Sequence, residues 1–116
     1  MRIIRGAEVE SLSADLPLDP GRLSANWLEG PFTADRLDVG MITMSPGGAT
    51  PRHVHEGGQV LIVTAGRGFV EVDGERHEIT VGDVVVCPPG EEHVHGAADD
   101  HHLAHLTVTT GSYWFP

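Results

Sequence analysis

The stretch His53-Val54-His55-Glu56-Gly57-Gly58-Gln59 decides how this sequence is interpreted, because it places metal-binding side chains at strand spacing. Alternate residues of a β-strand point to the same face, so His53 and His55 can bind one ion together. A second stretch of similar character, Pro88-Pro89-Gly90-Glu91-Glu92-His93-Val94-His95, lies further along the chain. The two stretches together predict one metal site, and its candidate ligands are His53, His55, Gln59 and His93.

The bulk composition restricts the class of protein. With 116 residues the chain has the size of one domain with a single core, so we expect one domain over residues 1–116. The formal charge of −10 argues against binding to nucleic acid or to an anionic membrane. No apolar run approaches the roughly 20 residues that span a bilayer, and no signal-peptide core is expected at the start. The single cysteine excludes an internal disulfide, so we expect a cytoplasmic location.

Short β-type runs separated by 15 glycines and eight prolines predict an all-β fold. We expect an irregular segment over residues 1–35, a barrel over residues 36–110 and an aromatic tail over residues 111–116. The dipeptide Asp73-Gly74 predicts a tight hairpin turn, because both central positions of a type I′ turn need positive φ. A double-sheet jelly roll fits the number of strands. Strands are predicted at residues 37–41, 59–64, 69–73, 75–79, 83–87 and 103–109.

The predicted ligands determine the charge of the site. Three neutral imidazoles and one amide oxygen leave a divalent ion its full positive charge, whereas a glutamate in place of Gln59 would cancel half of it. We therefore expect a Lewis-acidic site with one or two coordination positions open to a small molecule. Imidazole suits manganese, iron, nickel, zinc and copper, so the residues alone do not select the metal. The alternative is a chain that has these histidines and binds metal only weakly.

Two further histidines are candidates for proton transfer. His95 lies two residues after His93 and should share its face of the strand, and His105 lies in the last predicted strand. Each is either an uncoordinated base beside the metal or a hydrogen-bonded core histidine. The other candidates are expected outside the site: a small buried Cys87 and three solvated side chains, His77, His101 and His102.

The spacing of these residues resembles the two motifs of the cupin superfamily, and the resemblance covers most of the chain. Two positions depart from the family pattern, since Gln59 replaces a glutamate and Ala97 replaces an asparagine. The resemblance implies a double-stranded β-helix, which is a jelly-roll barrel. The motif positions are occupied by Gly47, His53, His55, Gln59 and Gly66 for the first motif, and by Gly82, Pro88, Gly90, His93 and Ala97 for the second.

Within the superfamily, the chain resembles small single-domain cupins of the bacterial manganese-dependent hydroxynitrile lyase type. This resemblance implies manganese as the metal on the four candidate ligands and His105 as the base. Val94 departs from it, because that group has tryptophan there, and the group also has a longer tail than the one that ends at Pro116. The segments that carry the resemblance are residues 26–30, 58–66, 82–85, 89–97 and 104–106.

These features favour a metal-dependent enzyme that acts on a small molecule with a hydroxyl or carbonyl group. The open metal position would serve as Lewis acid and His105 as base, with His95 nearby. One alternative is a dioxygenase with iron or nickel. Another is a cupin that binds a small ligand or a metal for sensing or storage, without catalysis.

The end of the chain is aromatic. Tyr113, Trp114 and Phe115 are consecutive, and a free tail would leave a large apolar area in water. We expect these side chains to dock, either on the chain's own barrel or on a second subunit. Ile3-Ile4 forms an apolar segment suited to a sheet edge, and small cupins commonly pair through their sheets. We therefore expect a homodimer with both segments near the interface.

Overall fold

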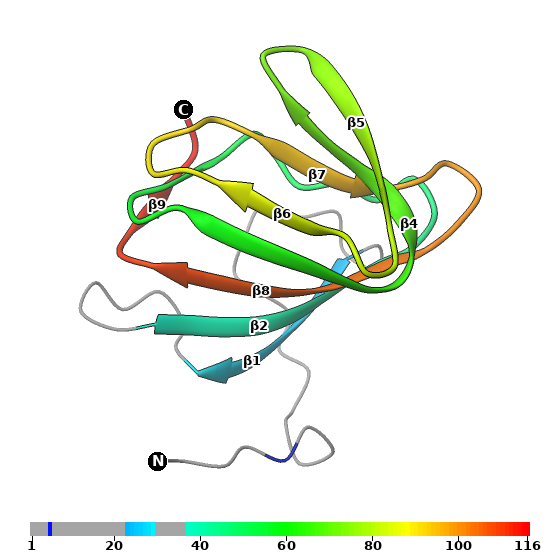
Figure 1. The fold of residues 1–116 in the computed structure, drawn as a ribbon, viewed down its shortest axis with the longest axis horizontal. Coiled ribbons are helices and arrows are strands. Elements are labelled where there is room, and N and C mark those ends of the chain that lie inside the picture. Colours follow the sequence, from blue (N-terminus) through cyan, green and yellow to red (C-terminus); the bar gives the residue numbers. More distant parts are fainter. Residues whose placement is uncertain (1–4, 6–22, 30–36) are drawn as a thin grey trace.

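The computed structural model describes Arg5, residues 23–29 and residues 37–116 of the chain. All regular elements in these residues are β-strands, and they include no helix that is able to span a membrane. The predicted all-β class is therefore confirmed (Figure 1). The strands are β1 (Leu23–Glu29), β2 (Leu37–Met44), β3 (Val54–His55), β4 (Gln59–Val72), β5 (Glu75–Thr80), β6 (Val84–Cys87), β7 (Val94–Ala97), β8 (Leu103–Thr110) and β9 (Tyr113–Trp114).

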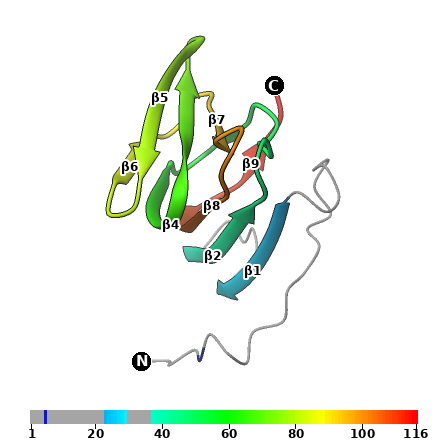
Figure 2. The same ribbon diagram turned by 90° about the vertical axis from the view of Figure 1, so that its right-hand side faces the viewer.

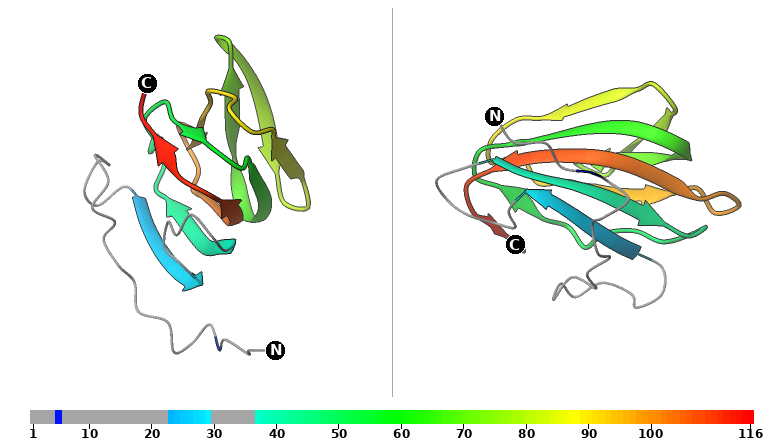
Figure 3. Two further views of the ribbon diagram at one scale, coloured as in Figure 1. Left: turned by 90° about the vertical axis from the view of Figure 1, so that its left-hand side faces the viewer. Right: turned by 90° about the horizontal axis from the view of Figure 1, so that it is seen from below.

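Strand β4 connects two parts of one seven-stranded sheet. Residues 59–62 of β4 pair with β6 on one side and with β8 on the other. Residues 67–72 pair with β5, and residues 68–71 also pair with β7. The sheet therefore curls, and its order β1-β2-β8-β4-β5 can be followed in Figure 2. Seen from below, β6, β4, β8, β2 and β1 lie side by side (Figure 3).

Glycines allow β4 to pass from one part of the sheet to the other. The register between β4 and β8 shifts just before Gly66, whose φ is 73°. A Cβ at Gly66 would collide with the carbonyl oxygen of His102, so only glycine fits. Bulges and glycines are typical of strands that bend at barrel corners. The prediction of two separate strands over residues 59–64 and 69–73 is therefore wrong, because the glycines bend the strand without ending it.

The inward faces of β4 and β8 change from apolar to polar along their length. In β8, Leu103 is followed on the same face by His105, Thr107 and Thr109, and all four are buried. Strand β4 is antiparallel to β8, and its buried side chains change from Val63 and Leu61 at the apolar end to Gln59 at the polar end. The apolar end packs into a core that excludes water, and the polar end is left to form the site. The core cluster contains Ile42, Met44, Val63, Val70, Ile79, Ala97 and Leu103.

The hairpin between β4 and β5 has the predicted turn. Asp73 and Gly74 have φ values of 52° and 76°, and Val72 pairs with Glu75. Positive φ at both central positions is the type I′ geometry that suits the twist of the flanking strands. This part of the prediction is confirmed.

The N-terminal segment is less irregular than predicted. Residues 23–29, for which loops were expected, form β1 and pair with β2 from Leu23 opposite Met44 to Glu29 opposite Val39. Strand β1 forms because β2 supplies hydrogen-bond partners for its backbone, and this pairing is not visible in the local sequence. Ile3-Ile4 lies outside the described residues, so its place at a sheet edge stays a prediction.

The aromatic tail docks on the chain's own barrel. Trp114 pairs with Val54 and Tyr113 pairs with His55, which makes β9 the partner of β3. The first of the two docking alternatives therefore holds for the backbone of the tail. The side chains of Trp114 and Phe115 keep exposed fractions of 46% and 39%.

Candidate metal centre

Backbone pairing brings the two histidine-containing stretches together. The amide of His53 donates to the carbonyl oxygen of His93 over 3.0 Å, and the amide of His93 donates back to that of His53 over 3.0 Å. In antiparallel pairs, opposite side chains lie on the same face of the sheet. This one reciprocal bridge therefore places the side chains of the two stretches next to each other, although the stretches are far apart in the sequence.

Three imidazoles meet on the inner face. A nitrogen from each of His53, His55 and His93 lies within 4.8 Å of the others, and all three side chains are buried. The ring centroids of His53 and His93 are 4.4 Å apart, and those of His53 and His55 are 5.0 Å apart. Nitrogens this close, brought together from the two histidine-containing stretches, form a donor set that can hold one ion.

Hydrogen bonds fix which nitrogen of each ring faces the cluster. Nδ1 of His53 lies 2.8 Å from the carbonyl oxygen of Pro51, and Nδ1 of His93 lies 3.1 Å from that of Glu91. A carbonyl oxygen only accepts, so Nδ1 carries the proton in both rings. Nε2 is then an unprotonated donor atom for a metal, and the backbone contact orients the ring as is typical of metal-binding histidines.

The fourth predicted ligand completes this set. The amide nitrogen of Gln59 donates to Oγ1 of Thr107 over 2.6 Å, which leaves its Oε1 pointing at Nε2 of His93, 2.7 Å away. Both of these facing atoms carry lone pairs and repel each other, so a cation bound by both atoms would stabilise the contact. Burial lowers the pKa of His93, so a proton is disfavoured as that cation. The donor chemistry therefore fits a cation held by three imidazoles and an amide oxygen.

The histidines of the site are neutral near pH 7. Burial lowers the pKa of His53 from 6.5 to about 4 and that of His55 to about 3. Neighbouring imidazoles lower the pKa of His55 further, because a second positive charge beside the first is unfavourable. Burial lowers the pKa of His95 well below its ordinary value and that of His105 to about 4. Neutral imidazole is the form that binds metal and accepts protons.

The two candidate bases form a pair at the edge of the cluster. Nε2 of His105 lies 3.1 Å from Nδ1 of His95, and both side chains are buried. The ring centroid of His95 is 5.1 Å from that of His53. His95 therefore lies between the cluster and His105, and the two histidines are linked by one hydrogen bond.

Some residues at the site were not singled out from the sequence. Thr107 bonds Gln59, Oγ1 of Thr50 accepts from the amide of His95 over 3.2 Å, and the ring of Tyr113 lies 6.2 Å from that of His55. Of these three residues, only Thr107 could have been found from the sequence. It lies two residues after His105 in the predicted strand, so its polar side chain shares the inner face. As expected, Cys87 is buried, and His77 and His102 are exposed; His101 is partly exposed.

A match to the model of the cupin domain covers residues 40–109, which include all four predicted ligands and both candidate bases. This chain belongs to the cupin family. Its jelly-roll barrel agrees with the double-stranded β-helix that the motifs implied.

Two curated relatives with known activities are similar to this cupin. An (R)-mandelonitrile lyase of Granulicella tundricola is 40% identical over 98 residues, which cover 76% of this chain and 75% of the lyase. A gentisate 1,2-dioxygenase of a Ralstonia species is 36% identical over 71 residues, which cover 60% of this chain and 20% of the dioxygenase. The cupin thus spans about a fifth of the dioxygenase and three quarters of the lyase.

Solved structures agree with the fold. A cupin-like protein from Thermotoga maritima is 29% identical, with a TM-score of 0.75 and coverage of 92% of this chain and 89% of that one. The polyketide cyclase RemF from Streptomyces resistomycificus has a TM-score of 0.79 at 24% identity and covers 94% of this chain and 78% of its own. The latter likeness concerns the fold alone.

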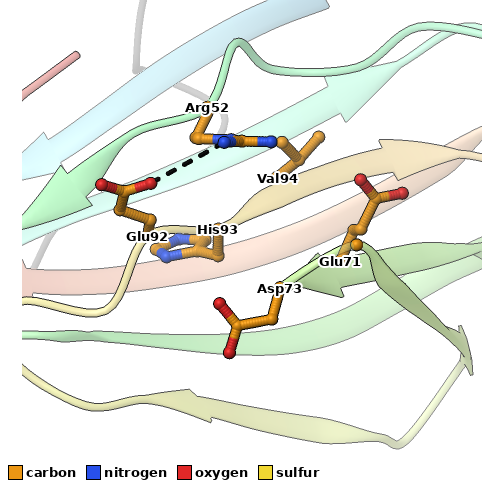
Figure 4. A pocket seen from close by; sticks show the side chains of 7 residues that line it. Arg52, Glu71, Asp73, Glu92, His93 and Val94 are labelled. Carbon is orange, nitrogen blue, oxygen red and sulfur yellow. Dashed lines mark ion pairs between the residues drawn. The ribbon is translucent and has the colours of Figure 1, made fainter. Parts of the chain in front are cut away.

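A pocket of about 120 Å³ lined mainly by charged side chains adjoins His93 (Figure 4). It lies among the β4–β5 hairpin, the start of β7 and the segment before β3. The guanidinium of Arg52 lies 3.8 Å from the carboxylate of Glu92, and both side chains are largely exposed. The remaining charged side chains that line the pocket are the carboxylates of Glu71 and Asp73. Arg76 lies 3.2 Å from the carboxylate of Glu71, so two of the three carboxylates that line the pocket are paired with arginines.

Proposed function

We propose that this cupin is a metal-dependent lyase of hydroxynitrile lyase type, acting on a small substrate with a hydroxyl or carbonyl group. The observation that carries the proposal is the neutral donor set of three imidazoles and an amide oxygen, with two uncoordinated histidines next to it. The 40% identity to an (R)-mandelonitrile lyase supports the same class of reaction.

The proposed ligands of the metal are His53, His55, Gln59 and His93, and the proposed metal is manganese. Iron, nickel and zinc are the alternatives, because imidazole accepts all of them. A divalent ion bound there would supply Lewis acidity toward a substrate oxygen, undiminished by any ligand charge. Burial of the cluster keeps bulk water away and holds the rings in the orientation that their backbone hydrogen bonds impose.

The protein's own part in the reaction is to accept and return a proton. In cleavage, the hydroxyl proton of a 2-hydroxynitrile passes to the His95–His105 pair. The bond between the hydroxyl-bearing carbon and the nitrile carbon breaks, the carbonyl forms, and the electron pair leaves with cyanide. The proton then returns to cyanide, so the products are a carbonyl compound and hydrogen cyanide. We assign the base to His105, and the 3.1 Å contact between the rings supports proton passage through His95.

The test starts with the native metal and then adds substrates. Metal analysis of the purified protein is followed by assays with aromatic and aliphatic 2-hydroxynitriles, in which aldehyde and cyanide are both measured. We expect release of both products by manganese-loaded protein and none by His93→Ala. Absence of turnover of every substrate by fully metal-loaded protein would overturn the lyase proposal.

A second candidate function is that of a dioxygenase. The similarity to a gentisate 1,2-dioxygenase over 71 residues favours it, and a histidine-rich site can also hold iron. Oxygen uptake by iron-loaded protein in the presence of gentisate would support this function. If neither assay gives turnover while metal or small molecules bind, the third reading, a non-catalytic binding protein, is the one that stands.

We also propose a cytoplasmic location. Cys87 is the only cysteine, and burial raises the pKa of its thiol to about 11, so the thiol stays protonated and unreactive. Proteins without disulfides are typical of reducing compartments. Fractionation of the native cells checks the location, and recovery of the protein outside the cytoplasmic fraction would contradict it.

A further inference from the structure

The short segment between the proposed ligands His55 and Gln59 is tied to the end of the chain by an acidic side chain. The amide of Glu56 donates to the carbonyl oxygen of Ser112 over 2.8 Å, and the amide of Ser112 donates to Oε2 of Glu56 over 3.1 Å. A carboxylate that accepts from a backbone amide makes a charge-assisted hydrogen bond, which is stronger than a neutral one. We call these two reciprocal hydrogen bonds the Glu56 clamp.

The two segments that the clamp joins are in close contact. A Cβ at Gly111 would lie 3.2 Å from the Cβ of Glu56 and 3.3 Å from its Oε2, so the acidic side chain lies along the backbone of Gly111. The amide of Gly57 donates to the carbonyl oxygen of Thr110 over 3.0 Å, and a Cβ at Gly57 would collide with Thr110. The clamp therefore belongs to a fitted contact between two parts of the chain.

The clamp continues the pairing of β9 with β3. These strands have two residues each, with Trp114 opposite Val54 and Tyr113 opposite His55. Such short strands have little stability of their own. The hydrogen bonds of Glu56 add to this pairing at its end, next to the strand that carries His55. We call residues 110–114 the tail strap; β9, its end, lies at the end of the barrel in Figure 1.

His55 is the proposed ligand whose orientation depends most on its surroundings. The rings of His53 and His93 are each oriented by a contact of Nδ1 with a backbone carbonyl oxygen. In the described part of the chain the ring of His55 has no such hydrogen bond, and its neighbours include the rings of His53 at 5.0 Å and Tyr113 at 6.2 Å. Metal-binding histidines usually have their second nitrogen hydrogen-bonded. The position of the strand must therefore orient this ring.

We propose that Glu56 is a positioning residue for His55: it holds the tail strap against the metal-binding segment and so keeps the His55 ring directed at the cluster. The proposal rests on the proposed metal site. Glu56 is exposed and lies outside the group of nitrogens that could hold the ion, so it acts through the backbone. The backbone of His55 is also held by the amides of Gly58 and Gly90, which donate to its carbonyl oxygen over 3.2 and 3.1 Å.

The test separates the reach of the side chain from its charge. Glu56→Asp keeps the charge, but its shorter side chain no longer reaches the amide of Ser112. Glu56→Gln loses the charge and keeps an acceptor oxygen at the same reach. We expect the affinity for manganese to fall about 10-fold in the aspartate variant and to stay within about 3-fold of the wild type in the glutamine variant. Competition with a fluorescent chelator measures the affinity without any assay of turnover.

A matched control makes the same substitution beside another proposed ligand. Glu92 directly precedes His93, and its carboxylate lies 3.8 Å from the guanidinium of Arg52 at the surface. Glu92→Asp should therefore keep the affinity of the wild type. Thermal melts of the metal-free proteins show whether each variant folds. If Glu56→Asp does not fold, Glu56→Ala replaces it with the same expectation, because alanine cannot form other hydrogen bonds with the nearby amides.

The outcomes distinguish this inference from the metal site on which it rests. A wild type that binds no metal would overturn both the site and the role of Glu56. A wild type that binds metal would leave the site in place, and three results would then overturn the role of Glu56 alone. These are an aspartate variant that binds as tightly as the wild type, a glutamine variant as weak as the aspartate variant, and a Glu92→Asp control with the same loss.

Discussion

Thr107 accepts a hydrogen bond of 2.6 Å from the side-chain amide of Gln59, although 48 residues separate them in the sequence. Both side chains are buried, with exposed fractions of 2% and 5%. The amide has one oxygen and one nitrogen, so occupation of the nitrogen by Thr107 directs the oxygen toward His93. Thr107 is thus a positioning residue for the proposed metal ligand.

The first prediction concerns this hydrogen bond. Thr107→Val keeps the shape of the side chain and removes the acceptor, so metal affinity should fall about 10- to 100-fold. Thr107→Ser restores the hydroxyl and should recover most of the affinity, which a purely structural loss would not allow. Competition with a chelator measures the affinity, and melts of the metal-free proteins serve as the control. Equal affinities for Thr107→Val and wild type would show that Thr107 does not position the ligand.

The second prediction concerns the neutral ligand itself. Gln59→Glu keeps an oxygen donor and adds a negative charge, so metal should be retained or bound more tightly. The rate of the proposed lyase reaction should fall, because the ion would be a weaker Lewis acid. Metal analysis and the product assay are made on the same preparation. An unchanged rate would mean that the neutral side chain is incidental.

The third prediction concerns metal content. Purified wild type should carry close to one divalent transition metal ion per chain, and either His53→Ala or His93→Ala should lose most of it. Each substitution removes one imidazole from a set whose nitrogens lie within 4.8 Å. His77→Ala, which changes an exposed histidine outside the cluster, is the matched control and should keep the full content. Full metal content in the double variant His53→Ala/His93→Ala would refute the site.

The fourth prediction concerns the pH dependence of stability without metal. In the folded protein the pKa values of His53 and His105 are about 4 and that of His55 is about 3, against 6.5 for an ordinary histidine. Below pH 6.5 the unfolded chain therefore takes up protons that the folded chain does not. The contribution of these histidines to the free energy of unfolding is complete above pH 6.5. As the pH falls from 6.5 toward 4, the free energy of unfolding decreases by up to about 1.4 kcal/mol per pH unit for each such group.

Denaturant titrations of the metal-free protein between pH 7 and pH 4 measure this slope. His53→Gln removes one of the groups and should make the dependence shallower. A free energy of unfolding that is constant across this range would contradict the burial of neutral imidazoles.

The fifth prediction distinguishes a base from a core histidine. If His105 is the base, His105→Ala keeps its metal and loses roughly 10²- to 10⁴-fold in rate. If His105 only fills the core, the same substitution lowers the melting temperature and leaves the rate per folded molecule near that of the wild type. Metal analysis, a thermal melt and the assay on one preparation decide between them.

The features that local spacing determines were predictable from the sequence. The alternation of His53 and His55 follows from strand geometry, and the Asp73-Gly74 turn follows from the φ values that such a turn requires. Nothing local marks the strand over residues 23–29, because β1 depends on pairing with β2. Backbone partners supplied by another part of the chain override local preference.

Relations between distant strands were out of reach of the sequence. The contact between Gln59 and Thr107 depends on the register of β4 against β8, which no pattern within either strand specifies. The same holds for the contact between His95 and His105, since β7 and β8 meet across the barrel without pairing directly. The motifs therefore identify the ligands, whereas the sheet order identifies what supports them and what surrounds them.

The pairing of β9 with β3 has a practical consequence for anyone who handles this protein. Tyr113 lies opposite His55, so the chain ends within a few residues of a strand that carries a candidate ligand. An affinity tag fused after Pro116 would lie close to this pairing, and deletion of residues 113–116 would remove the strand with which β3 pairs in the described part of the chain. A purification that preserves the native metal should therefore avoid a tag at this end of the chain.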